Sequence, residues 1–470
     1  MLLTIDIGTS AFKSAVWDYS GARLSFASAP MVINNTEGDR HEAVPSQWLD
    51  AFDECCEKHG NMNAIKAIVI SGNGPSLVPV LGEPVFGNSM YVPAENARLW
   101  LDRRAAKYSG VVSDLMKGFV DASFFLPKIL YIKNEESELY RKVKHFLGCP
   151  EYLAYALTGQ ARSVFPSEGF DRWFWDNSIL DKLHLDKLKI PPFLSPGGAF
   201  GTISVKAAER FGFSEDIPVI SGGPDFFSAI LGSGVVKPGA ACNRTGSSDG
   251  VNLCTVKRVK NKMLMSYRHP VRQFWNLSGM INTTGRAIEW GRELLGIENI
   301  NDFIALAEKS KYGSEGLVFL PYLAGERAAV WNHDAKAVWR GINLNTGRCE
   351  FANSILESIG FAIKDIICAM EETGEKVEQM HVTGGLAGIE RLNQIKADIT
   401  GKEIITCVCK EAELLGLAVI GSCFLGKYSS FSQAVSEMCR IEKKYIPNSY
   451  NNDLYNNLYN EYKVVRNNIQ

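Results

Sequence analysis

The sequence predicts an α/β protein of two halves, with strands and helices alternating along each half. Short β-branched runs alternate with segments whose apolar residues recur at steps of three or four, which is typical of α/β layers. A turn of glycine and hydroxyl residues lies near the start of each half, at 8–10 and at 246–248. A stretch dense in glycine and proline at 231–239 lies close to the midpoint, where a domain boundary is expected.

These observations place an N-terminal domain at 1–234 and a C-terminal domain at 235–470. The two turns indicate an internal duplication only weakly, because nothing else recurs visibly. In the first half, a buried strand is expected at 64–70, and an edge strand at 77–81, because Pro79 cannot donate to a strand ladder. Helical spacing predicts further helices, at 138–147, at 151–157, at about 351–373 and in the tail from 448.

Composition excludes several classes of protein. The chain has 470 residues, of which 46% are hydrophobic and 22% charged, as in an ordinary soluble globular protein. Fifty basic residues balance 52 acidic ones, so nothing points to nucleic acid or to an anionic membrane. No apolar stretch reaches the roughly 18 residues that a membrane span needs. Eleven cysteines without a framework predict free thiols in a reducing cytoplasm.

The first ten residues predict a phosphate-binding turn. A buried strand ends at Asp6, and Gly8 then allows the backbone to approach an anion with its N–H groups. Thr9 and Ser10 add hydroxyl donors, and Lys13 adds a positive charge. Asp6 is placed to hold a hydrated divalent cation beside the phosphate. With the second turn at 246–248, this predicts a nucleotide held between two related domains.

Asp225 is the candidate general base. It follows the strand 217–220 and the glycine turn 221–224, which present one carboxylate without an adjacent basic residue. Such a carboxylate can deprotonate an alcohol that lies within hydrogen-bond reach. The alternative is a turn aspartate that caps the following helix.

The segment 98–104 is a candidate sugar site. Trp100 can lie against a sugar ring, while Asp102 and Arg103 can bind its hydroxyls. The alternative is a solvated run of charge. Further along, Gly384 and Gly385 follow a strand and precede a helix, and this arrangement offers backbone N–H groups to a phosphate or a ribose.

Taken together, these motifs resemble the FGGY family of carbohydrate kinases from about residue 2 to about residue 427. Each motif is modest, but their common order makes coincidence improbable. The motifs are, in chain order, DIGTS at 6–10, WLDRR at 100–104, FFLPK at 124–128, GPD at 223–225, GSS at 246–248, GER at 325–327, GG at 384–385 with Gln394 and Ala397-Asp398, and EAELLGLA at 411–418.

The resemblance implies two ribonuclease-H-like domains of the actin and hexokinase superfamily, with ATP, Mg²⁺ and sugar in the cleft between them. Asp225 is then the general base and Asp6 the metal-side residue, while Thr9 and Ser10 approach the transferring phosphate. The positions that match the nucleotide side of the family are Gly246 and Ser247 in the second turn, Gly285 and Glu289 beside the nucleotide, and Gly384 and Gly385 at the adenosine.

One departure affects the substrate. Xylulokinases of this family have Met-His, and glycerol kinases Arg-Glu, where this chain has Gly74-Pro75. A polar contact to the sugar is therefore missing or replaced, although Asn73 remains available. Leu386 and Ile389 also depart from the glycine turn of the family, so a difference in nucleotide affinity or base selectivity is expected.

The sequence thus predicts a cytoplasmic ATP-dependent kinase for a hydroxyl of a small sugar or polyol. A ketopentose of the xylulose type is the first candidate, and gluconate, a deoxyketose or a four-carbon polyol are the alternatives. A non-catalytic nucleotide- or sugar-binding member of the family is the rival class. No nucleic acid or membrane partner is expected, and a homodimer is one assembly that the sequence leaves open.

Overall fold

The computed structural model describes residues 1–34, 37–87, 89–118, 120–164, 168–169, 175–328, 330–332 and 334–468. These residues form two compact units. The first comprises Met1–Gly232 and Glu413–Met438, and the second Ser233–Ala412 and Cys439–Gln470. The expected division assigns everything after 234 to the second domain, whereas in the structure 413–438 groups with the first unit.

The first unit is built on a six-stranded sheet in the order β13-β14-β5-β1-β2-β3. Strands β1, β5 and β14 run parallel to one another, whereas β2, β3 and β13 are antiparallel to their neighbours. The strands of this sheet are β1 (Leu2–Ile7), β2 (Ala11–Trp17), β3 (Arg23–Pro30), β5 (Ala67–Gly72), β13 (Ala199–Thr202) and β14 (Pro218–Pro224). Strand β5 overlaps the run predicted as a buried strand at 64–70 and continues to Gly72, and all its residues are buried.

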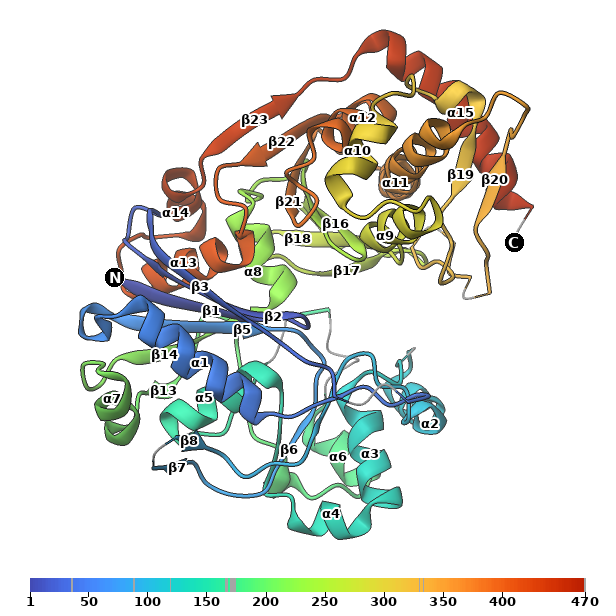
Figure 1. Ribbon diagram of the computed structural model, residues 1–470. Coiled ribbons are helices and arrows are strands. Elements are labelled where there is room, and N and C mark those ends of the chain that lie inside the picture. Colours follow the sequence, from blue (N-terminus) through green and yellow to red (C-terminus); the bar gives the residue numbers. More distant parts are fainter. Residues whose placement is uncertain are drawn as a thin grey trace. The chain divides into compact units, whose positions relative to one another are not determined.

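Helices cover both faces of this sheet. In Figure 1, α1 and α5 lie on one side of it and α13 on the other. The helices of the first unit are α1 (Ser46–His59), α2 (Ala106–Met116), α3 (Phe125–Glu135), α4 (Ser137–Lys142), α5 (Cys149–Thr158), α6 (Asn177–Lys182), α7 (Val205–Phe211), α8 (Asp225–Gly232), α13 (Ala412–Phe424) and α14 (Phe431–Met438).

Short strands complete the first unit. They are β4 (Glu42–Ala43), β6 (Val78–Val80), β7 (Val85–Phe86), β8 (Met90–Tyr91), β9 (Ala97–Arg98), β10 (His145–Leu147), β11 (Ser163–Val164) and β12 (Phe193–Leu194). Strand β6 lies in a two-stranded sheet, as expected for an edge strand that contains Pro79. The helix predicted at 138–147 is wrong in its second half, because α4 ends at Lys142 and residues 145–147 pair with β6. Apolar residues at helical spacing do not reveal this tertiary pairing.

The second unit repeats the arrangement around a seven-stranded sheet in the order β17-β18-β16-β15-β21-β22-β23. Strand β15 is antiparallel to β16 and parallel to β21, just as β1 is antiparallel to β2 and parallel to β5. The strands are β15 (Ala240–Thr245), β16 (Asp249–Thr255), β17 (Met265–Arg268), β18 (Trp275–Ile281), β21 (Gln379–Gly384), β22 (Glu403–Cys407) and β23 (Ile441–Tyr445), with the separate pair β19 (Val318–Leu320) and β20 (Val338–Arg340).

Helix α11 passes through the core of the second unit. The helices are α9 (Gly285–Leu294), α10 (Ile300–Ala307), α11 (Arg348–Glu371), α12 (Glu390–Thr400) and α15 (Ser449–Asn467). Ile355, Ile359 and Ile363 of α11 are completely buried, as the helical spacing of this segment predicts. The helix predicted in the tail is α15, which buries Tyr455 and Tyr462 on one face.

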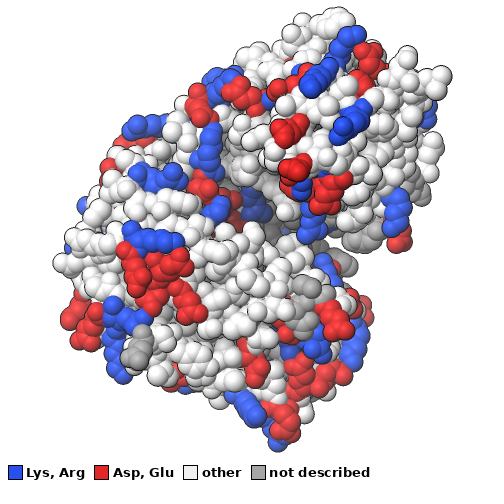
Figure 2. All heavy atoms as spheres, viewed as in Figure 1, with Lys and Arg blue, Asp and Glu red and all other residues white. Residues whose placement is uncertain are grey.

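The surface and the cysteines agree with the composition. Figure 2 shows acidic and basic side chains interspersed in small groups on the face in view. All eleven cysteines are free thiols. Among the described residues, no helix is long and apolar enough to cross a membrane.

Candidate active site

Three neighbouring parallel strands bring the main candidate residues of the first unit to one sheet edge. In the strand register, Ile7 of β1 lies opposite Gly72 of β5, and Gly72 lies opposite Pro224 of β14. The carboxyl ends of these strands therefore meet. Ligands of open α/β sheets bind at this end of the strands.

Asn73 joins two of these strand ends. Its backbone N–H and its Nδ2 both donate to the Ile7 carbonyl, at 2.8 and 2.9 Å. Its Oδ1 accepts from Ser76 Oγ at 2.5 Å. On the other side of β5, Ser71 Oγ donates to the Gly223 carbonyl at 2.7 Å. The strand ends are thus fixed to one another through hydrogen bonds to the backbone.

A buried thiol contacts this edge of the sheet. Cys149 at the start of α5 donates to the Asn73 carbonyl at 3.0 Å. Burial raises the pKa of this thiol well above its usual value, and the negative charges of Glu151, Asp6 and Asp225 raise it further. The thiol therefore stays protonated and unreactive.

The turn 8–10 connects β1 to β2. The Gly8 N–H donates to the Ala11 carbonyl at 2.9 Å, and a Cβ at position 8 would lie 2.7 Å from that oxygen, so only glycine fits. Thr9 Oγ1 accepts from Trp100 Nε1 at 3.0 Å. Lys13 lies opposite Asp6 in the register of β1 and β2. The Gly8 N–H is therefore used within the turn, contrary to the prediction that it is available to an anion, and the turn contacts the predicted sugar residue Trp100 through Thr9.

Asp225 is the first residue of α8, at the end of β14. Its Oδ1 accepts from the Phe226 N–H at 2.7 Å, and its carbonyl accepts from Ser228 Oγ at 2.9 Å. Asp225 thus contacts the start of α8, and it lies at the sheet edge that carries Asp6 and Asn73.

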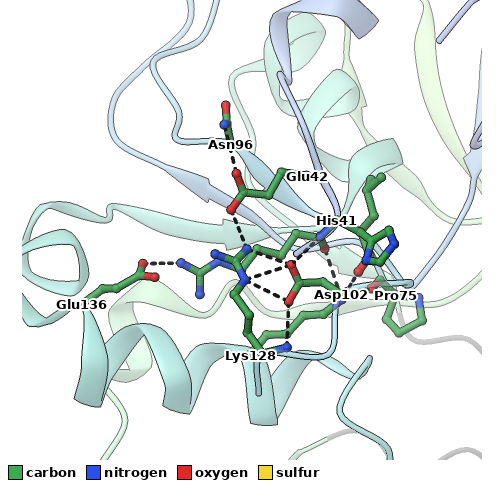
Figure 3. A network of polar contacts seen from close by, with 10 residues as sticks. His41, Glu42, Pro75, Asn96, Asp102, Lys128 and Glu136 are labelled. Carbon is green, nitrogen blue, oxygen red and sulfur yellow. Dashed lines mark hydrogen bonds and ion pairs between the residues drawn. The ribbon is translucent and has the colours of Figure 1, made fainter. Parts of the chain in front are cut away.

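The segment 98–104 is not a solvated run of charge. Asp102 is only 1% exposed, and it accepts from Arg104 Nη2 at 2.8 Å and from the His41 N–H at 3.1 Å. Arg104 also pairs with Glu42 at 2.6 Å (Figure 3). Although burial opposes ionisation, the bonds from Arg104 and His41 keep the pKa of Asp102 below its usual value.

The sugar-binding residues predicted in this segment therefore differ in their surroundings. Arg103 forms an ion pair with Asp121. The Asp102 carboxylate is buried among protein donors, which suits support of the loop rather than contact with a ligand. Trp100 is half-buried and contacts Thr9.

In the second unit, the turn 246–248 connects β15 to β16 and contacts the start of α9. The Gly285 N–H donates to the Gly246 carbonyl at 2.9 Å, and a Cβ at Gly285 would lie 2.4 Å from that oxygen. The N–H groups of Thr284 and Arg286 both donate to the Ser247 carbonyl, at 3.2 and 3.3 Å. One turn later on α9, the exposed Glu289 pairs with Arg292 at 3.0 Å.

The glycine turn after β21 lies beside the same strand, β15. The Gly385 N–H donates to the Thr245 carbonyl at 3.1 Å, and the Leu386 N–H donates to Thr245 Oγ1 at 3.1 Å. Gly384 has a φ of +89°, and a Cβ there would lie 2.1 Å from the Thr245 carbonyl. The residues predicted on the nucleotide side therefore surround the end of β15 in one unit.

Comparison with known proteins identifies the family. The chain matches the N-terminal domain of the FGGY family of carbohydrate kinases over residues 1–232 and the C-terminal domain over 241–424. The chain belongs to the FGGY family of carbohydrate kinases. This confirms the resemblance, the enzyme class and the two-domain α/β fold with ribonuclease-H-like domains.

Individual FGGY proteins are similar over their whole length. A xylulose kinase of Staphylococcus epidermidis is 25% identical, and the match covers 99% of this chain and 96% of that protein. The crystal structure of a xylulose kinase from Lactobacillus acidophilus matches with a TM-score of 0.85 at 23% identity, over 99% of this chain and 98% of that one. A gluconate kinase structure from the same organism matches with a TM-score of 0.85 at 22% identity, over 99% and 97%. At this identity the two structures establish the fold.

One polar group of this FGGY chain is not predicted by the sequence motifs. Asp249 Oδ1 accepts from the Gly246 N–H at 3.3 Å and from Thr284 Oγ1 at 2.6 Å, so it fixes the second turn to the start of α9. Behind it, Lys396 Nζ lies 3.8 Å from Asp249 Oδ2 and donates to Asn243 Oδ1 at 2.8 Å. Burial lowers the pKa of Lys396 to about 8, although Asp249 counteracts it.

The signal for this group was present in the sequence. Asp249 directly follows the second turn, and Lys396 lies between Gln394 and Ala397, which belong to the family motif that begins at Gly384. Neither position indicates by itself that the two side chains meet, because 146 residues of chain and two strand crossovers separate them.

Proposed function

We propose that this FGGY protein transfers the γ-phosphoryl group of ATP to a hydroxyl of a small sugar or polyol, with Asp225 as general base. The observation that carries the proposal is the shared edge of β1, β5 and β14. It gathers Asp6, Asn73 and Asp225 beside the turn 8–10. Phosphoryl transfer needs little beyond alignment, charge neutralisation and one base. In this proposal Asn73 aligns the acceptor, Lys13 and a cation held by Asp6 neutralise charge, and Asp225 is the base.

In the proposed reaction, a hydroxyl oxygen of the acceptor attacks the γ-phosphorus. Asp225 takes the hydroxyl proton as the new P–O bond forms. The bond between the γ-phosphorus and the bridging oxygen breaks, and ADP leaves with that oxygen. Gly8, Thr9, Ser10 and Lys13 lie nearest to the transferred group in this proposal.

Magnesium fits the residues present. It prefers one or two carboxylates together with water and substrate phosphates, rather than a cage of protein ligands. Within the described residues, no group of three or more His, Cys, Asp and Glu side chains could hold a metal ion. Asp6, half-buried at the end of β1, supplies the single carboxylate that such a site needs. When bound, Mg²⁺ neutralises charge on the phosphates.

ATP fits the second unit. We assign its phosphates to the turn with Gly246 and Ser247 and its adenosine to Gly384 and Gly385. A Cβ at Gly385 would meet nothing within 4 Å, so the space over this backbone is open to a ligand. Gly285, at the N-terminus of α9, adds a helix end whose dipole favours phosphate.

The acceptor that we propose first is a ketopentose of the xylulose type, because the motif spacing and the similarity to xylulose kinases both favour it. Gluconate, a deoxyketose and a four-carbon polyol are the alternatives within the family. The Gly74-Pro75 turn is the reason for keeping them, since it lacks the polar side chains of xylulokinases and glycerol kinases. A Cβ at Gly74 would meet nothing within 4 Å, so this turn leaves room next to Asn73.

A panel of acceptors tests the proposal. ADP release is measured with ATP and Mg²⁺, first without acceptor and then with pentuloses, hexuloses, aldonates and polyols. We expect strong stimulation by one neutral ketopentose. Stimulation by gluconate alone would move the substrate to an aldonate. Stimulation by no acceptor would favour a non-catalytic binding protein on the same fold.

A further inference from the structure

The motif at 124–128 has no role in the proposed chemistry, yet its last residue, Lys128, is a buried cation. Lys128 lies on α3 and is completely buried. Figure 3 shows it close to Asp102.

The Lys128 ammonium is bonded to backbone carbonyls. Nζ donates to the carbonyl of Leu99 at 2.7 Å, to that of Pro75 at 2.8 Å and to that of Arg98 at 3.1 Å. An ammonium group has three donors, so these bonds use all of them. One side chain thus connects α3 to two segments of chain, the turn at 73–77 and the segment 98–102.

Both segments lead directly to the candidate active site. Asn73, two residues before Pro75, donates to the Ile7 carbonyl at the end of β1. Trp100, the residue after Leu99, donates to Thr9 in the phosphate turn. Lys128 therefore links the two segments, 73–77 and 98–102, whose residues contact the end of β1 and the turn 8–10.

Charged groups of both signs surround Lys128. Asp102 and Asp121 favour the ammonium, whereas Arg98 and Arg103 oppose it. Burial lowers the pKa of Lys128 well below its usual value. Removing a charged group from water is unfavourable unless hydrogen bonds replace the lost water, and here three backbone carbonyls do so. Lys128 thus fixes three backbone carbonyls around one ammonium group.

We propose that Lys128 is a positioning residue for acceptor recognition, which holds the Pro75 turn and the Trp100 segment in one fixed arrangement. This rests on the proposed function only for its effect on catalysis, since the contacts themselves lie within the first unit. The ammonium does not touch the transferred phosphate in this proposal.

Two variants and a matched control test the proposal. Lys128→Met removes all three donors, and Lys128→Gln keeps two. The control is Lys133→Met on the same helix. Lys133 also donates to two carbonyls, those of Leu183 and His184, at 3.0 and 2.7 Å, and these residues are distant in sequence from 73–77 and 98–102.

The first readout is kinetic. Lys128→Met should raise the acceptor KM at least about tenfold, because small displacements of positioning groups have large effects. The KM for ATP and the kcat at saturating acceptor should change less than about threefold. Lys128→Gln should lie between wild type and Lys128→Met, and Lys133→Met should match wild type. A fall in kcat with unchanged acceptor KM would overturn the proposal.

The second readout is independent of activity. Amide hydrogen exchange in residues 73–77 and 98–102 should accelerate in Lys128→Met and remain unchanged in Lys133→Met. Unchanged exchange in both segments would overturn the bridging role, whatever the activity. If wild type phosphorylates no acceptor, the proposed function is wrong, while exchange still decides the bridging role. Unfolding of both Lys128 variants would make Lys128 a stability residue and would also overturn the proposal.

Discussion

At the scale of single residues, the molecule uses its carboxyl groups in distinct ways. Asp225 lies at the start of a helix and at the candidate sheet edge. Asp102 is buried in an ion pair with Arg104, where it supports a loop. Glu357 is buried in the core of the second unit. Their residue types are alike, and only their surroundings separate the tasks.

Asp225→Ala should lose nearly all turnover, because a positioned base contributes about 10²–10⁴-fold. Nucleotide affinity, measured by calorimetry without acceptor, should stay unchanged. The matched control is Asp216→Asn, an exposed turn residue whose loss should not affect turnover. A variant of Asp225 that keeps more than roughly a tenth of the rate would refute the assignment of the base.

Glu357 predicts a pH-dependent stability. Burial raises its pKa to about 7, although Tyr455, Ser314 and the Gly313 N–H donate to it. The folded state therefore binds a proton that the unfolded state has released, between about pH 4.5 and about pH 7. In this window the contribution of Glu357 to stability falls by about 1.4 kcal/mol per pH unit as the pH rises.

Glu357→Gln should remove this part of the pH dependence, because a neutral amide does not titrate. The thermal unfolding midpoint, measured from pH 5 to pH 7, should fall less in the variant than in wild type. Glu315→Gln, at an exposed position, should follow wild type. Equal slopes in all three proteins would show that Glu357 has the same pKa in the folded and unfolded states.

At the scale of elements, the position of Asp225 depends on how α8 packs. Helix α13 approaches α8 so closely that a Cβ at Gly416 would lie 1.8 Å from the Ser228 carbonyl. Strand β14 ends at Pro224 and α8 begins at Asp225, so a shift of the helix moves Asp225. Only glycine permits this contact between the two helices.

Gly416→Ala should therefore destabilise the protein and lower turnover together. Overpacking of this kind costs about 1–3 kcal/mol, and the displaced α8 should misplace Asp225. Gly110→Ala is the control, since a Cβ there meets nothing within 4 Å on the exposed face of α2. It should stabilise the helix by about 0.5–1 kcal/mol. Thermal unfolding and the acceptor assay measure both effects.

At the scale of the whole molecule, the two units share one strand arrangement and carry different candidate residues. The first unit places Asp6 and Asp225 at its sheet edge, while the second places Gly246, Gly285 and Gly384 around the end of β15. The duplication that the two turns indicated weakly is evident in the matching strand orders. A substitution in the second unit should therefore weaken nucleotide binding, whereas one in the first unit should lower turnover.

Gly384→Ala should weaken nucleotide binding at least about tenfold, because an alanine at this positive φ would collide with the Thr245 carbonyl. Equal nucleotide affinity in Gly384→Ala and wild type would remove the adenosine assignment.

Asp6→Asn should keep nucleotide affinity measured without Mg²⁺ and lose most of its turnover. Raising Mg²⁺ should restore part of the Asp6→Asn rate, whereas chelation should abolish turnover in wild type.

The sequence by itself determined the family, the α/β class and the order of the motifs, because these depend on local patterns and on glycines that a turn requires. It also predicted several single elements, among them β5, β6, α5, α11 and α15, but it missed the pairing of 145–147 with β6, which is a contact between distant segments. The roles of Asp6, Asp225 and the nucleotide residues stay predictions.

Only the tertiary structure decided which side chains meet. The phosphate turn contacts Trp100, Lys128 bonds to the Pro75 and Leu99 carbonyls, and Asp102 is enclosed by Arg104. Lys396 of α12 likewise lies near Asp249 of β16 only because the chain folds these two distant segments together. Hydrogen bonds and burial act across space, whereas residue spacing reports only on neighbours along one strand or helix, so no local pattern could predict these contacts.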